Sequence, residues 1–387
     1  MPRPVLKTPL TERLGIEYPI ILAGMGAGNE GGAAGPELVA AVSEAGGLGV
    51  LGGTGRNLDD FHEACAKIRK LTKKPFGVDL LLPQVSSSSV SLPPERERLG
   101  EGPSDLDPRY KAWADDIIHD LGLAEPSHAA ERGGGGAWGG GEERIARHIE
   151  AILEEKPAVF AAGLGSPARY VPALHQAGIT VFGLVGNVKT ARKVKADGVD
   201  VIVAQGHEAG GHTGRIGTFA LVPQVIDAVN PMPVVLAGGV GSGRSVAAAF
   251  ALGAQAVWCG TIFLATPEAN ITDAHRQHLV AATEEDTRVS RVYSGKTARA
   301  LVNPVIESWE RSGLPALPMG LQSRLSGRVQ LAARNSGRPD LMMQLGGQIA
   351  GSLTAVRPAA AVLDQLVRET VDVLSHLQGR VTYSTGG

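Results

Sequence analysis

The sequence predicts an α/β fold: a TIM (β/α)8 barrel with an insertion after the third strand and added C-terminal helices. Three observations support this prediction. Short, fully apolar runs alternate with amphipathic stretches along the 387-residue chain, which is typical of βα units around a parallel sheet. The runs are numerous enough for eight strands, the number that closes such a barrel. Several runs end in or next to glycine, as strands do where the backbone approaches a ligand closely.

Each strand is predicted from an apolar run bounded by glycine, proline or polar residues. In chain order, the predicted strands cover residues 18–25, 48–52, 75–83, 158–165, 180–186, 201–206, 233–240 and 256–265. Apolar residues at helical spacing in the other stretches predict helices, which include residues 36–47, 58–71, 189–198, 243–254 and 359–377. Several of these stretches end in glycine, a frequent helix C-terminus.

Residues 84–141 interrupt this alternation. They contain a serine run, a charged stretch, a predicted helix over 110–122 and the run "GGGGAWGGG". A glycine run cannot pack a core, so we interpret the segment as a flexible loop elaboration, with a lid over the barrel mouth or a subunit contact as the alternatives. The chain is accordingly divided into a barrel over residues 1–265 and a C-terminal helical extension over 266–387 that packs on it.

Composition excludes several classes of function. The formal net charge is −2 and aromatic residues make up 4% of the chain, so we expect no nucleic-acid partner. No stretch reaches the roughly 18 apolar residues of a membrane span, and the N-terminal residues lack the apolar core of a signal peptide. Cys65 and Cys259 lie far apart in the sequence, which favours two buried thiols in a reducing compartment. We therefore expect a cytoplasmic protein with no membrane partner.

Two glycine turns point to a phosphate-bearing cofactor. "GGVGSGRS" follows the seventh predicted strand and opens a helix, and "CGT" lies in the eighth. Bare N–H groups in such turns bind anions, and TIM barrels commonly hold a phosphate between the loops after strands seven and eight. The residues concerned are Gly238, Gly239, Gly241, Gly260 and Thr261.

Two other motifs receive less weight. "GMGAGNEGG" after the first strand resembles a Rossmann phosphate turn, but the second strand ends in "VLGGTG" without the required carboxylate. "HEAGGH" resembles the zinc motif H-E-x-x-H, yet it is one residue too long and its two glycines would break the helix. We therefore expect neither a dinucleotide fold nor a metal site.

The chain resembles the nitronate monooxygenase family of FMN-dependent TIM barrels, which are related to FMN-containing enoyl-ACP reductases. "IILAGM", "AQGHEAGGHTG", "FALVPQVIDAV", "PVVLAGGVGSGR", "ALGAQAVWCGTIFLAT" and, weakly, "GGQIAG" at 346–351 carry the resemblance. It implies FMN as the cofactor and His212 as the catalytic residue. The cofactor-binding residues that it and the strand ends suggest are Ala23, Gly24, Met25, Asp79, Gln205, Gly210, Gly211, Gly238, Gly239, Gly241, Gly260 and Thr261. Asp79 stands where the family often has asparagine, and a lysine that some members carry near Leu184 is missing.

Histidine can take up a proton near neutral pH. The resemblance implies FMN-dependent oxidation of alkyl nitronates, or of the nitroalkanes they equilibrate with, by O2 to a carbonyl compound and nitrite, and His212 is the expected base. His207 and Glu208 are interpreted as residues that hold the turn. The alternatives are an NAD(P)H-dependent FMN reductase of enoyl thioesters or quinones and a flavin-binding barrel without turnover. The C-terminal helices offer a contact for a homodimer.

Overall fold

The computed structural model describes residues 4–26, 32–82, 107–126 and 141–378. Eight parallel strands form one sheet in the order β1-β9-β8-β6-β5-β4-β3-β2. Their bounds are β1 Ile20–Leu22, β2 Gly49–Gly52, β3 Phe76–Leu81, β4 Val159–Gly163, β5 Thr180–Val185, β6 Val201–Gln205, β8 Val234–Ala237 and β9 Ala256–Cys259. A parallel bridge between Ile21 and Leu48 joins the two end strands, and Leu22 N–H donates to the Leu48 carbonyl at 2.9 Å. The barrel is thereby closed, and the predicted TIM fold is confirmed.

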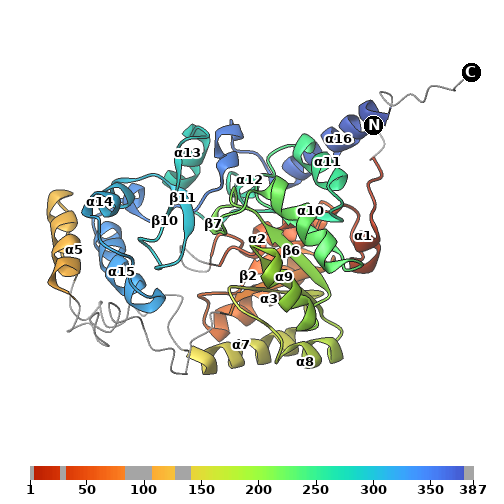
Figure 1. Cartoon of the computed structure of the whole chain (residues 1–387), viewed down its shortest axis with the longest axis horizontal. Coiled ribbons are helices and arrows are strands. Elements are labelled where there is room, and N and C mark those ends of the chain that lie inside the picture. Colours follow the sequence, from red (N-terminus) through yellow and green to blue (C-terminus); the bar gives the residue numbers. More distant parts are fainter. Residues whose placement is uncertain (1–3, 27–31, 83–106, 127–140, 379–387) are drawn as a thin grey trace, which may run out of the picture.

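Helices surround this barrel and continue after it (Figure 1). Several begin at an asparagine whose side chain accepts from the first turn, which satisfies an otherwise unpaired N–H. Asn57 Oδ1 accepts from Asp60 N–H at 2.8 Å, and Asn187 does the same for Thr190. The helices are α1 Pro9–Leu14, α2 Pro36–Glu44, α3 Leu58–Leu71, α5 Pro108–Asp120, α7 Gly141–Glu155, α8 Val171–Gln176, α9 Val188–Ala196, α10 Thr218–Val229, α11 Gly243–Ala251, α12 Thr261–Leu264, α13 Asp273–Ala281, α14 Pro304–Ser312, α15 Met319–Asn335 and α16 Ala359–Gln378.

The strands are mostly apolar because both of their faces are buried; Asp79 on β3 is a buried exception. Side chains alternate between two cores along each strand: Ile21, Phe182 and Trp258 belong to the core inside the barrel. Ile20 and Leu22 belong to the core between the sheet and its helices. This double burial explains why the strands could be located from apolar runs.

Several predicted strands are longer than the observed ones, and the run 256–265 exceeds its strand the most. Of residues 256–265, only Ala256–Cys259 form a strand, and Thr261–Leu264 form the short helix α12. Every side chain from Thr261 to Leu264 is buried, so an apolar run continues through the strand end into the helix. Periodicity alone cannot separate the two in such a run.

The C-terminal part contains more than the predicted helices. β10 Thr287–Ser290 and β11 Ala298–Leu301 form an antiparallel hairpin. The two-residue strand β7 Gly211–His212 then pairs with β11, so that His212 faces Ala298. The structure thus joins the loop after β6 to a hairpin that lies far along the sequence.

Helix α5, from the predicted insertion, packs against α14 and α15 and not against the barrel (Figure 1). The rings of Trp113 and Trp309 meet edge to face with centroids 5.0 Å apart, and both belong to a second buried core. Residues 83–106 and 127–140, where the flexible part of the insertion is predicted, lie outside the described residues. The division of the chain at residue 265 stays a prediction.

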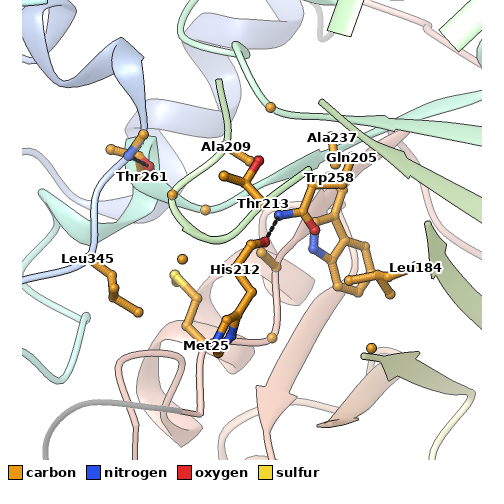
Figure 2. A pocket seen from close by; sticks show the side chains of 18 of the residues that line it. Met25, Leu184, Gln205, Ala209, His212, Thr213, Ala237, Trp258, Thr261 and Leu345 are labelled. Carbon is orange, nitrogen blue, oxygen red and sulfur yellow. Dashed lines mark hydrogen bonds between the residues drawn. The ribbon is translucent and has the colours of Figure 1, made fainter. Parts of the chain in front are cut away.

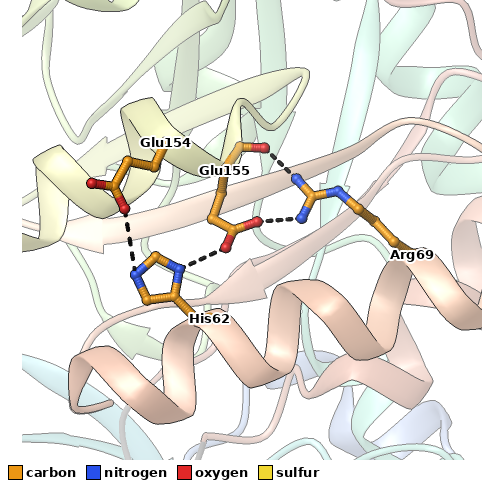
Figure 3. A network of polar contacts seen from close by, with 4 residues as sticks. All are labelled: His62, Arg69, Glu154 and Glu155. Atoms are coloured by element: carbon orange, nitrogen blue, oxygen red, sulfur yellow. Dashed lines mark hydrogen bonds and ion pairs between the residues drawn. The ribbon is translucent and has the colours of Figure 1, made fainter.

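Helix α7 carries the chain from this region back to the barrel and is tied to α3 by a polar network (Figure 3). The Glu155 carboxylate accepts from Arg69 and lies 2.6 Å from His62 Nδ1. Glu154 lies 3.8 Å from the other nitrogen of the same ring. None of these four residues lines the pocket described below, so the network supports the fold. No helix in the described ranges is both long and apolar enough to cross a membrane.

Candidate active site at the carboxyl ends of the strands

A pocket of about 740 Å³ opens where the parallel strands end. Residues at or just beyond the carboxyl ends of β1, β3, β4, β5, β6, β8 and β9 line it. This is the face on which TIM barrels carry their active sites, and the volume lies within the range of about 300–1,000 Å³ typical of small-molecule sites. The barrel therefore presents one candidate site at its expected end.

Nearly all of the predicted site residues lie in this pocket. Those that line it are Ala23, Gly24, Met25, Asp79, Gln205, Gly210, Gly211, His212, Gly238, Gly239, Gly260 and Thr261. They come from the ends of five barrel strands and from β7.

Gly241 is the exception, because the structure does not bring it to the pocket wall. Its N–H donates to Ser245 Oγ at 3.1 Å, and a Cβ at this position would lie 2.9 Å from Ser352 Oγ. The N–H of Gly243, the first residue of α11, is bound by the Glu369 carboxylate at 2.8 Å. Ser245 and Glu369 thus already bind the N–H groups at this helix N-terminus, which the sequence suggested as donors to a phosphate.

The first two glycines of this turn, and the second turn at Gly260 and Thr261, keep the features of an anion site. Gly238 and Gly239 have φ values of 94° and 77°, a conformation that glycine adopts readily. Thr261 Oγ accepts from Gly347 N–H at 2.8 Å. Among the described residues no acceptor is recorded for the Thr261 hydroxyl proton, so this O–H can donate to a ligand. Uncharged donors of this kind suit a phosphate.

Two further glycines leave no room for a side chain. A Cβ on Gly24 would overlap Asp79 Cβ, and a Cβ on Gly210 would lie 2.7 Å from the backbone of Gly346. Real Cβ contacts are not this short, so the neighbouring backbone would have to move. These glycines set how closely the loops after β1 and β6 approach their neighbours.

Asp79 is a buried carboxyl group on β3, with 4% of its surface exposed. Burial raises its pKa to about 8, because the low-dielectric surroundings disfavour the charged form. At neutral pH the carboxylic acid is therefore the main form. Like the amide of an asparagine, it can both donate and accept a hydrogen bond in the pocket.

His212 is held on β7 by contacts on both sides. Gln205 Nε2 donates to the backbone carbonyl oxygen of His212 at 2.7 Å (Figure 2). The imidazole Nε2 of His212 lies 2.9 Å from Ser294 Oγ. Burial, and secondarily the positive charge of Lys296, lower the pKa of His212 to about 4. The imidazole is therefore neutral near pH 7 and able to accept a proton.

The remaining polar residues of the "AQGHEAGGH" segment hold the turn. His207 Nδ1 lies 2.8 Å from the Gly214 carbonyl oxygen. The Glu208 carboxylate accepts from both the N–H and the hydroxyl of Thr218, at 2.8 and 2.7 Å. Arg299, on β11, donates twice to the His207 carbonyl. Within the described part of the chain, no group of three His, Cys, Asp or Glu residues is arranged to hold a metal ion.

Sequence reasoning missed a second wall of the pocket. Lys296 and Thr297 enter it from the β10–β11 hairpin, and Met342, Met343 and Leu345 from the segment after α15. The strands of that hairpin are short and only partly apolar, so they gave no signal. The weak match at "GGQIAG" was the one pointer, since Gly346 and Gly347 also line the pocket.

The sequence model of the nitronate monooxygenase family matches residues 7–369. The chain is 35% identical to the putative monooxygenase Rv1533 of Mycobacterium tuberculosis, over 97% of this chain and 100% of that protein. It is 32% identical to a probable nitronate monooxygenase of Staphylococcus aureus, over 96% and 99%.

Among solved structures, nitroalkane oxidase from Streptomyces ansochromogenes is 28% identical and superposes with a TM-score of 0.77, covering 96% of this chain and all of that one. FabK from Thermotoga maritima is 30% identical with a TM-score of 0.72, over 97% of this chain and all of that one. The family model and both relatives extend over nearly the whole chain, which supports an enzyme and not a barrel without turnover. The chain therefore belongs to the nitronate monooxygenase family and is an oxidoreductase.

Proposed function

We propose that this protein binds FMN and oxidises alkyl nitronates with O2 to a carbonyl compound and nitrite. One observation carries the proposal: a neutral, acceptor-competent imidazole and a set of uncharged anion donors lie in the same pocket. Family membership supports the class of reaction.

The pocket residues fit FMN. Bare turns at Gly238 and Gly239 and the hydroxyl of Thr261 would hold the phosphate, since the space at Gly239 is open: a Cβ there would have Glu208 Cβ as its nearest neighbour, at 3.8 Å. Gln205 would contact the ribityl chain, and Met25 would lie against the ring. When bound, the flavin supplies the electron transfer that no side chain can perform.

The chain's own contribution is proton transfer and orientation. A nitroalkane carries an acidic hydrogen on the carbon beside its nitro group, and His212 would remove that proton to leave the nitronate anion. An imidazolium formed there without a neighbouring negative charge would be disfavoured by burial and by Lys296. The nitronate charge that forms in the same step offsets this cost, so the two charges stabilise each other.

The first test is an absorbance spectrum of the purified protein, where an oxidised flavin spectrum is expected. A colourless protein that refuses added FMN would refute the proposal. The second test is His212→Asn, which should keep its flavin but lose about 10²–10⁴-fold in turnover of neutral nitroalkane. Turnover of preformed nitronate should fall far less. Equal losses on both substrates would reject His212 as the base.

A second candidate function is an NAD(P)H-dependent reductase of enoyl thioesters or quinones. The structural similarity to FabK supports it, as does the apolar wall formed by Met342, Met343 and Leu345. Anaerobic mixing with NADPH separates the two. Rapid bleaching of the flavin favours the reductase, whereas bleaching by nitronate alone favours the monooxygenase. A cytoplasmic location and a homodimer stay predictions.

A further inference from the structure

The β10–β11 hairpin brings one lysine to the pocket beside His212. Thr213 N–H donates to the Thr297 carbonyl at 3.2 Å, and the Thr297 hydroxyl donates to the Thr213 carbonyl at 2.9 Å. Together with the pairing of His212 and Ala298, these bonds fix the backbone on both sides of the contact. Lys296 directly precedes them and lines the pocket. Its place next to His212 therefore follows from the sheet.

Lys296 carries the pocket's uncompensated charge. Among the described residues, four carboxyl or ammonium groups line the pocket: Asp79, Lys193, Glu208 and Lys296. Asp79 is mainly protonated at neutral pH. The Glu208 carboxylate is bound by Thr218, and its negative charge interacts with the positive charge of Arg299.

Lys193 forms an ion pair with Asp197, with 2.9 Å between Nζ and Oδ2. Lys296 is exposed, and no ion-pair partner is recorded for it in the described part of the chain. Its ammonium can therefore bind an anion from solution without first breaking a salt bridge.

We propose that the Lys296 ammonium binds the negatively charged oxygens of the nitronate and so selects an anionic substrate at the mouth of the pocket. This inference rests on the proposed function and deepens it.

The position also suits the reaction of a neutral nitroalkane. Negative charge develops on the nitro oxygens as His212 takes up the proton, and a nearby ammonium stabilises that charge as it forms. Lys296 would thus assist the reaction of both substrates. For the nitronate, which is already an anion, it would act when the substrate binds. A nitronate should consequently depend on Lys296 through KM.

The test compares Lys296→Met with Lys296→Arg in the flavin-loaded protein, with Lys193→Met as the matched control. The control removes a lysine from the same pocket, but one whose charge is already paired. Lys296→Met should raise the KM for the nitronate of nitroethane roughly tenfold or more, the effect of losing one charge-assisted contact. Lys296→Arg and Lys193→Met should stay within about threefold of the wild type, and flavin content should be unchanged throughout.

Ionic strength gives an independent readout. Wild-type kcat/KM for the nitronate should fall as salt is added, because salt screens the attraction between opposite charges, and Lys296→Met should lose this dependence. Unchanged KM and an unchanged salt dependence in Lys296→Met would overturn the inference.

A binding measurement separates this inference from the proposed function. Nitrate is a planar anion that resembles the nitro group, and its binding to the oxidised holoenzyme can be followed by the flavin spectrum. If nitronate is not oxidised but nitrate binding still weakens about tenfold in Lys296→Met, the proposed function fails while the anion site stands. If nitronate is oxidised and nitrate binding is equal in both proteins, the anion site is refuted.

Discussion

Replacing Asp79 with asparagine should change how the protein's stability depends on pH. The ordinary pKa of an aspartate, 3.8, describes the unfolded chain, whereas burial raises the pKa in the folded protein to about 8. Between these values the folded state keeps a proton that the unfolded state releases. Its stabilising effect is therefore complete below about pH 4 and is lost as the pH rises toward 8.

The size of the effect follows from the same linkage. Where the folded state binds one more proton than the unfolded state, the free energy of unfolding falls by about 1.4 kcal/mol for each pH unit. The side-chain amide of the Asp79→Asn variant cannot titrate, so this slope should be absent from the variant. Asparagine has nearly the same shape as the carboxylic acid and also donates and accepts hydrogen bonds, so no cavity is created.

Urea unfolding of both proteins at intervals from pH 5 to pH 9 measures the difference. Every other titrating group is shared by the two proteins, so its contribution cancels when one curve is subtracted from the other. The Asp79→Asn variant should gain stability relative to the wild type as the pH rises, and the gain should level off above about pH 8. Parallel curves would show that the carboxyl group of Asp79 is ionised in the folded protein at neutral pH.

Three further outcomes are expected. Gly210→Ala would place a Cβ 2.7 Å from backbone, so flavin should bind at least tenfold more weakly in a fluorescence titration; wild-type affinity would contradict the close approach. Trp309→Ala removes a buried ring from the second core and should cost about 3–5 kcal/mol in urea unfolding, whereas a loss below about 1 kcal/mol would show that this core is loosely packed. Ser294→Ala removes the hydroxyl 2.9 Å from His212 and should slow turnover of neutral nitroalkane about fivefold while sparing preformed nitronate; equal effects would argue against a role in orienting the base.

The sequence predicted the barrel well because its strands are buried on both faces and their apolar runs are nearly continuous. It also identified pocket residues at the ends of the strands, since glycine turns there are visible as residue types. It could not reveal that Ser245 and Glu369 occupy the donors around Gly241, because the contact with Glu369 joins residues 126 positions apart. The charge state of Asp79 was hidden for a related reason: it depends on burial, which is a property of the folded chain.

The second pocket wall could not be predicted from local patterns. The hairpin strands are four residues each, and β7 has two. Helix α5 could be predicted from its sequence, but its packing on α14 could not, because Trp113 and Trp309 are brought together only by the tertiary fold.

The pairing of β7 with β11 links the pocket to the C-terminal hairpin in addition to the barrel. The turns at Gly238 and Gly260 belong to the barrel. His212 is paired with β11, and Ala300 of β11 packs in the same core as α5 and α14. A shift of that core relative to the barrel would therefore move His212 relative to the turns at Gly238 and Gly260. Substitutions in the contact between α5 and α14 are therefore expected to change the rate of turnover, although these helices do not line the pocket.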